Sequence, residues 1–94
     1  MQERPRKVGV AWYRPDEYDR LRALMSDAGK LPADYASWLR SAEQVAGEVA
    51  RSGIEVVRVV VETDAFRLWC EAKGIQPDGA ARARYAQDSV AGQL

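Results

Sequence analysis

Residues 54–62, IEVVRVVVE, form the stretch that decides the fold, because they are dense in valine and lie between Gly53 and Thr63. β-branched residues favour strands, and alternation predicts one fully apolar face. The other face carries Arg58 and Glu62 and is expected to be half exposed to water. This strand leaves an edge that needs covering. Our hypothesis is that two copies of the chain join edge to edge there into a four-stranded sheet.

The other apolar stretch that predicts a strand is VGVAWY, at residues 8–13. Both of its faces are apolar, so we expect covering elements on both sides. Gly9 and Ala11 share one face, where their small side chains would let a helix backbone approach closely. The same alternation points Trp12 and Tyr13 to opposite faces, which predicts that the two rings cannot enter one small core.

Two helices are expected between these strands. The first begins at Pro15-Asp16-Glu17, where proline and acidic residues are favoured, and ends at Gly29. The second is longer, begins with Leu31-Pro32-Ala33-Asp34 and ends at Gly53. Their apolar stripes, at spacings of three and four, are Tyr18, Leu21, Leu24, Met25 and Ala28 in the first helix, and Tyr35, Trp38, Leu39, Ala42, Val45, Ala46 and Val49 in the second.

Two more helices are expected after the second strand. Thr63 or Asp64 would cap the third helix, which ends at Lys73-Gly74. Asp78 would cap the last helix, from about residue 80 to Val90. The positions expected to face inward are Phe66, Leu68, Trp69, Cys70, Ala81, Tyr85 and Val90.

The predicted order is therefore β-α-α-β-α-α. If successive elements reverse direction, the two strands are antiparallel neighbours. The prediction is an α+β fold with two short antiparallel strands covered by four helices, and with the sheet extended by dimerisation. The 94 residues suit one domain spanning residues 1–94. Residues 1–6 are expected to form a flexible arm, and residues 91–94 a frayed tail.

The composition excludes several kinds of chemistry. The chain has no histidine and one cysteine, so histidine-based triads and zinc sites are not expected, and we predict neither a metal nor a cofactor. Cys70 falls within a helix, which favours a buried structural thiol over a redox thiol. The acidic residues Asp16, Glu17 and Asp19 suggest a cation site at first sight, but they are typical of a helix start.

Charge is balanced, with 14 basic and 14 acidic residues. Residues 1–14 nevertheless carry a net charge of +3, mostly from Arg4, Arg6 and Lys7, which predicts a solvated arm or, alternatively, a phosphate-contacting one. The N-terminus has no apolar stretch behind its charged residues, and no segment reaches the roughly 20 apolar residues of a membrane helix. We therefore expect a cytoplasmic protein that does not bind membranes.

The best-supported functional prediction is a non-catalytic protein–protein interaction module, acting as an adaptor, regulator or small inhibitor of a larger bacterial assembly. Its partner would be a protein, with a homodimer also expected. One alternative is a nucleic-acid-binding module that uses the basic arm and the last helix; another is a small-ligand binder or a histidine-free enzyme. Aromatic residues and arginine dominate interfaces, so the predicted partner-binding residues are Trp12, Tyr13, Arg14, Arg82, Arg84 and Tyr85.

Three stretches carry a resemblance that covers nearly the whole chain: VGVAWYRPDEYDRL at 8–21, YASWLRSAE at 35–43 and FRLWCEAKGIQPDGAARARYA at 66–86. In these stretches the chain resembles a small, uncharacterised family of bacterial cytoplasmic proteins with no assigned activity. The resemblance implies a bacterial, soluble, single-domain protein, and it implies no functional residues.

Overall fold

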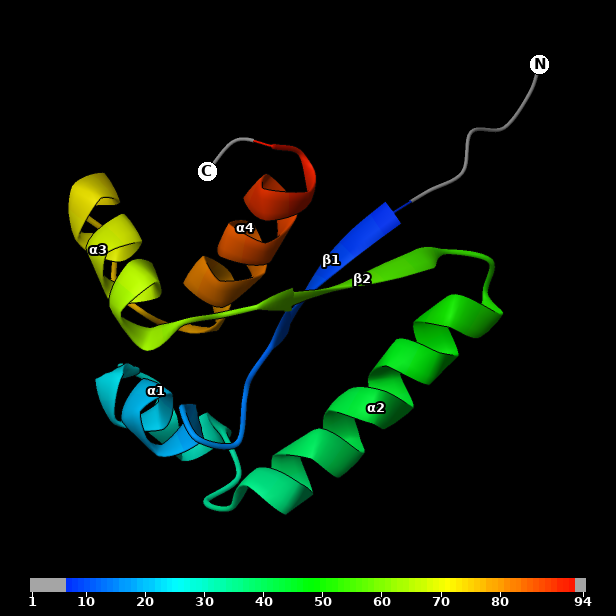
Figure 1. Cartoon of the computed structure of the whole chain (residues 1–94), viewed down its shortest axis with the longest axis horizontal. Helices are drawn as coiled ribbons and strands as arrows, with labels where there is room; N and C mark the ends of the chain where they lie inside the picture. The colour runs from blue at the N-terminus through cyan, green and yellow to red at the C-terminus, as the bar shows by residue number, and fades with distance from the viewer. Residues whose placement is uncertain (1–6, 93–94) are drawn as a thin grey trace.

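The fold is a two-stranded sheet with helices on both faces, seen in a computed structural model that describes residues 7–92 (Figure 1). The elements are β1 (Lys7–Trp12), α1 (Tyr18–Leu24), the 3₁₀ turn η1 (Ala28–Lys30), α2 (Tyr35–Arg51), β2 (Glu55–Val60), α3 (Thr63–Lys73) and α4 (Gly79–Val90). The α+β prediction with four α-helices and two strands is confirmed for this part of the chain. The predicted arm at 1–6 and residues 93–94 of the predicted tail lie outside it.

The strands are parallel, so the prediction of an antiparallel pair was wrong. Lys7 pairs with Glu55 and Trp12 with Val60, in unbroken register. The prediction assumed that α1 runs the full length of the sheet and reverses the direction of the chain. Instead α1 has only seven residues and lies beyond the carboxyl end of β1, while the 17-residue α2 alone returns the chain to the opposite end (Figure 1). One long return helix is the connection that a parallel pair requires.

A glycine decides how closely α4 approaches the sheet. A Cβ atom at Gly9 would clash with the carbonyl oxygen of Ala86. The backbone of α4 therefore crosses β1 at a distance that only glycine allows. The prediction that small residues on β1 admit a helix is confirmed at this position.

The other face of the sheet is covered by α2, so both faces have helical cover as predicted (Figure 1). The cover is incomplete, because an open hollow of about 410 Å³ lies between β1 and α2. Val45, which was expected in the buried stripe of α2, lines this hollow and is 53% exposed. Leu68 on α3, also expected to face inward, is 56% exposed.

Trp12 and Tyr13 both pack against the ring of Trp38, with centroids 5.2 and 4.6 Å away. The prediction that they could not enter one core was wrong, because Tyr13 follows the last residue of β1 and strand alternation no longer governs it. The apolar core is continuous and also includes Phe66 and Cys70 from α3.

Several helix boundaries differ from the prediction. α1 begins at Tyr18 rather than at Pro15-Asp16-Glu17, which form a turn before it. α1 ends at Leu24 rather than near Gly29, since the N–H of Ser26 donates to the carbonyl of Pro77 instead of continuing the helix. α3 begins one or two residues earlier than expected, with Glu62 rather than Thr63 or Asp64 at the cap position. By contrast, Asp78 caps α4 as predicted, accepting from the N–H of Ala81.

Candidate functional site

The outer edge of β2 is an open hydrogen-bonding edge. The N–H of Val61 donates to the carbonyl of Trp12, which fixes the direction of the backbone groups along β2. In a parallel ladder, residues alternate between those that bond to the neighbouring strand and those that point away from it. Val57, Val59 and Val61 therefore face β1, and Val56, Arg58 and Val60 face outward. Among the described residues, no hydrogen bond involves the backbone groups of these outward residues.

The outer edge of β1 is occupied in part by other elements. The outward N–H of Gly9 donates to the side-chain carbonyl oxygen of Gln87 at 2.6 Å. Beyond the end of the strand, the carbonyl of Tyr13 accepts from the hydroxyl of Tyr35 at 2.9 Å. Unpaired strand edges invite pairing with other chains, and folded proteins usually cover them. α4 and α2 thus occupy part of the outer side of β1, while among the described residues the outward backbone groups of Ala11, like those of β2, have no bonded partner.

The side chains along β2 leave this edge clear. Val60 is one of three large apolar side chains described as exposed, at 41%. Arg58 is exposed, but its guanidinium carbon lies 4.1 Å from the centre of the Trp12 ring and so turns back over the sheet. The Glu62 side chain is 62% exposed, and its one ion pair with a described residue is the contact to Arg14 at 4.0 Å. We call Val56, Arg58, Val60 and Glu62 the β2 edge.

The six predicted partner-binding residues do not form one surface. Tyr13 and Tyr85 are 3% and 8% exposed and belong to the core. Trp12 is partly buried beneath Arg58, beside the β2 edge. Arg14 and Arg84 are exposed, and Arg84 lies over the ring of Trp69 with its own carboxylate partner Asp88 at 3.8 Å. The sixth residue is Arg82.

Arg82 is held in an ion pair inside the structure. Its Nη1 atom donates to Asp27 at 2.9 Å, and only 12% and 16% of the two side chains are exposed. The other carboxylate oxygen of Asp27 accepts from the N–H of Gly79, the first residue of α4. The hydrogen bond from Arg82 is the main reason that the pKa of Asp27 lies below its usual range. The guanidinium of Arg82 therefore fixes the start of α4 rather than facing a ligand.

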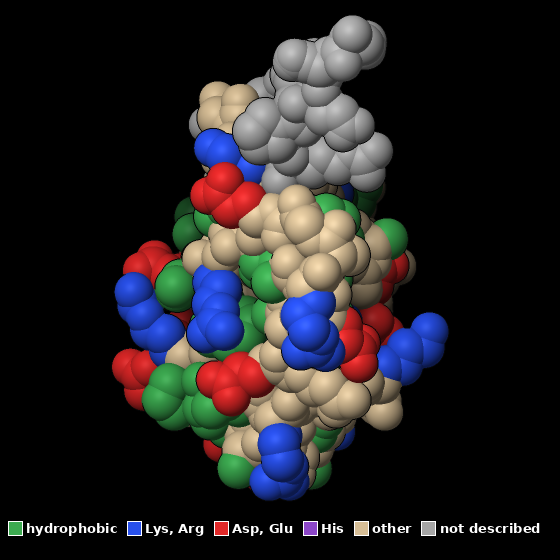
Figure 2. All heavy atoms as spheres, turned by 90° about the vertical axis from the view of Figure 1, so that its right-hand side faces the viewer, with side chains coloured by type: hydrophobic (Ala, Val, Ile, Leu, Met, Phe, Trp, Pro, Cys, Tyr) green, Lys and Arg blue, Asp and Glu red, His purple; other side chains and the backbone are tan. Residues whose placement is uncertain are grey.

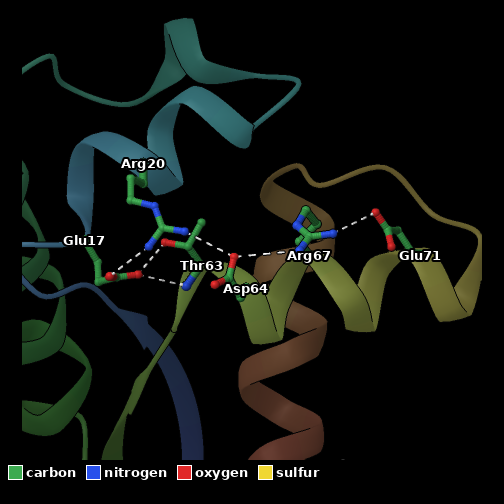
Figure 3. Close-up of polar contacts among 6 residues, drawn as sticks. All are labelled: Glu17, Arg20, Thr63, Asp64, Arg67 and Glu71. Atoms are coloured by element: carbon green, nitrogen blue, oxygen red, sulfur yellow. Dashed lines mark hydrogen bonds and ion pairs between the residues drawn. The ribbon is translucent and has the colours of Figure 1, made fainter.

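A second carboxylate plays the same part for α3. One oxygen of Glu17 accepts from both the N–H and the hydroxyl of Thr63, the first residue of α3 (Figure 3). These bonds lower the pKa of Glu17. Arg20 extends the network to Asp64 at 3.1 Å, and Arg67 links Asp64 to Glu71 along α3 (Figure 3). The acidic helix start predicted from the sequence thus also anchors another helix.

The remaining candidates for chemistry are the Cys70 thiol and clusters of metal-ligating side chains. Cys70 is 2% exposed, and burial raises the pKa of its thiol, as expected for a structural cysteine. Within residues 7–92 there is no cluster of three side chains suited to holding a metal ion. Figure 2 shows one face of the molecule, on which basic, acidic and apolar side chains are interspersed.

Sequence reasoning predicted that two copies pair along the edge of the valine-rich strand, but its list of partner-binding residues included none from the β2 edge. The available signal was the half-polar face carrying Arg58 and Glu62. It missed Asp27 altogether, because its partners Gly79 and Arg82 lie more than fifty positions away in the sequence.

No helix within the described residues is long and apolar enough to cross a membrane. Neither the curated proteins nor the solved structures give a match to the chain. A family model described as a domain of unknown function (DUF8829) matches residues 1–93, and the chain therefore belongs to this family.

Proposed function

We propose that the chain is a non-catalytic protein-interaction module that receives an extended strand of its partner along the β2 edge. The observation that carries this proposal is the row of unbonded backbone groups along β2 beside the exposed side chain of Val60. Gln87 of α4 and Tyr35 of α2 bind outward groups of Gly9 and Tyr13 on the β1 side, whereas among the described residues the outward backbone groups of Val56, Arg58 and Val60 have no bonded partner. Strand addition uses such main-chain groups for affinity and neighbouring side chains for specificity.

Two features favour strand addition over a chance opening in the fold. Val60 is exposed beside the free backbone groups, so an added strand would bury apolar surface as well as form hydrogen bonds. A charged side chain on an edge strand disfavours pairing with another strand, but here the guanidinium of Arg58 lies over Trp12. A two-stranded sheet is also marginal in water and gains from a further strand.

The nucleic-acid alternative has less support from the geometry. This alternative uses two arginines of the last helix. Arg82 is paired with Asp27 and is not available to a phosphate, and the guanidinium of Arg84 has Asp88 nearby. The balanced charge of the chain also lacks the basic excess typical of such modules. For a small-ligand site, the hollow of about 470 Å³ beside α4 offers Asp27 and Arg82, which already satisfy each other.

The proposal is tested by capture of partners from a lysate of the source cells, with and without nuclease. The bait variants are the unmodified chain, Val60→Pro and Val60→Thr. Proline removes the outward N–H, which has no bonded partner within residues 7–92, while threonine keeps that donor and a similar shape. We expect a protein that survives nuclease, is lost with Val60→Pro and is retained with Val60→Thr. Capture that is indifferent to Val60→Pro, or that disappears with nuclease, would refute the proposal.

A further inference from the structure

We infer that the strand received by the β2 edge is β2 of a second copy of the chain, in antiparallel orientation about a two-fold axis at Val60. This inference rests on the proposed function, because it requires the β2 edge to accept a strand. It replaces the unspecified edge pairing expected from the sequence with one defined register. The product is a four-stranded sheet in which each β2 lies next to the other and each β1 lies outermost.

The symmetry of such a pair places a residue opposite its own copy and pairs the flanking residues crosswise. With the axis at Val60, the two exposed valines meet at the centre. Arg58 and Glu62 each lie two positions from Val60, so position 58 of one copy lies opposite position 62 of the second copy. The guanidinium of Arg58, which lies over Trp12 in the single chain, would turn outward in the pair to meet this carboxylate. The symmetry creates this opposite-charge pair twice, and directly opposed opposite charges stabilise a pair of strands.

Backbone geometry is compatible with this register. Val60 and Arg58 point outward from β2, and Glu62 continues in an extended conformation with φ −91° and ψ 137°. The carbonyl of Glu62 already accepts from Phe66 at the start of α3, and among the described residues its N–H has no bonded acceptor. That N–H is therefore available to donate to the carbonyl of Arg58 in the second copy.

Other symmetric registers are less favourable. An axis at Arg58 places the two guanidiniums directly opposite each other, which is destabilising. An axis at Val57 or Val59 places Arg58 opposite a valine and leaves its charge without a direct partner. An axis at Val56 pairs Arg58 with Ile54 and leaves Val60 outside the shared centre. Only the Val60 axis combines burial of the exposed valine with charge complementarity.

The test is the oligomeric state of the full chain, measured by sedimentation equilibrium at micromolar concentrations. We expect a dimer. Arg58→Glu and Glu62→Arg should each weaken dimerisation by about tenfold or more, because each substitution changes two symmetry-related pairs. The double variant with both substitutions restores opposite charges and should dimerise within about threefold of the unmodified chain. Circular dichroism confirms that each variant is folded.

Cross-linking tests the register independently. In Val60→Cys, the opposed Cα atoms would be about 5.5 Å apart, within the range that a disulfide can bridge. Mild oxidation should link two copies of this variant. The unmodified chain is the control, since its Cys70 is buried and should form no linked dimer.

A monomeric unmodified chain would overturn the inference, and so would a dimer that shows neither charge-swap rescue nor cross-linking at residue 60. The two proposals fail separately. A monomer whose capture of another protein still depends on Val60→Pro would overturn self-association alone. A monomer whose partner capture ignores Val60→Pro would overturn both the self-association and the function of the β2 edge.

Discussion

The carboxylate of Asp27 and the guanidinium of Arg82 meet at 2.9 Å although 55 positions separate them in the sequence. Asp27 lies in the segment after α1, and Arg82 lies in the first turn of α4. The second carboxylate oxygen accepts from the N–H of Gly79, so one side chain satisfies a helix start and neutralises a largely buried cation. This arrangement joins the first third of the chain to its last helix.

Removing this carboxylate should destabilise the fold substantially. In Asp27→Ala, Arg82 loses its partner and the N–H of Gly79 loses its acceptor, so we expect the free energy of unfolding to fall by about 2–4 kcal/mol. Urea unfolding followed by circular dichroism measures the change. Asp88→Ala is the matched control: it removes the looser contact to the exposed Arg84 and should cost less than about 0.5 kcal/mol. Equal losses in the two variants would contradict this account.

The close approach of α4 to β1 predicts opposite effects of one methyl group at two glycines. Gly9→Ala forces a Cβ atom against the backbone of Ala86 and should destabilise the protein by about 1–3 kcal/mol. Gly47→Ala lies within α2, where the added Cβ would meet only the Arg51 side chain at 3.5 Å. It should stabilise the protein by about 0.5–1 kcal/mol through helix propensity. Thermal unfolding of both variants provides the comparison. A Gly9→Ala variant that is as stable as the unmodified chain would show that α4 can shift away from β1.

Acid should weaken the fold through its carboxylates. The pKa values of Asp27, Glu17 and Asp34 are lowered in the folded state, chiefly by hydrogen bonds from Arg82, Thr63 and Ser37 respectively. A carboxyl whose pKa is lowered by folding contributes stability above its unfolded pKa, near 4, and loses it as the pH falls through the folded value. Urea unfolding between neutral pH and about pH 3 should therefore show falling stability.

Asp27→Asn should flatten this dependence on pH, because its contribution no longer titrates. An unchanged acid dependence in Asp27→Asn would mean that other groups control acid unfolding.

The thiol of Cys70 should be unreactive in the folded protein. It is 2% exposed, and its pKa is raised mainly by burial, with further contributions from Asp78 and Glu71. A colourimetric thiol reagent should therefore label the native chain slowly and the urea-unfolded chain at once. Rapid labelling under native conditions would instead indicate a redox-active thiol or local opening of α3.

Features decided within a few residues could be predicted from the sequence. Asp34 and Asp78 each accept the N–H three residues ahead, and the positive φ of Gly74 ends α3. The strand direction could not be predicted in this way, since it depends on whether α1 spans the sheet. Glu17 was interpreted only as part of a helix start and Asp27 was not singled out, because their partners Thr63 and Gly79 lie far away in the sequence.

The position of β1 also constrains the order in which the chain can fold during synthesis. Among the described elements this strand is made before the others, yet it pairs with β2 and is crossed by α4, so its neighbours are made only after more than forty further residues. A nascent chain that has emerged as far as α2 holds an apolar strand with no partner on either edge. Stable structure must therefore await the later elements, and β1 is the segment most exposed to premature aggregation or to chaperones.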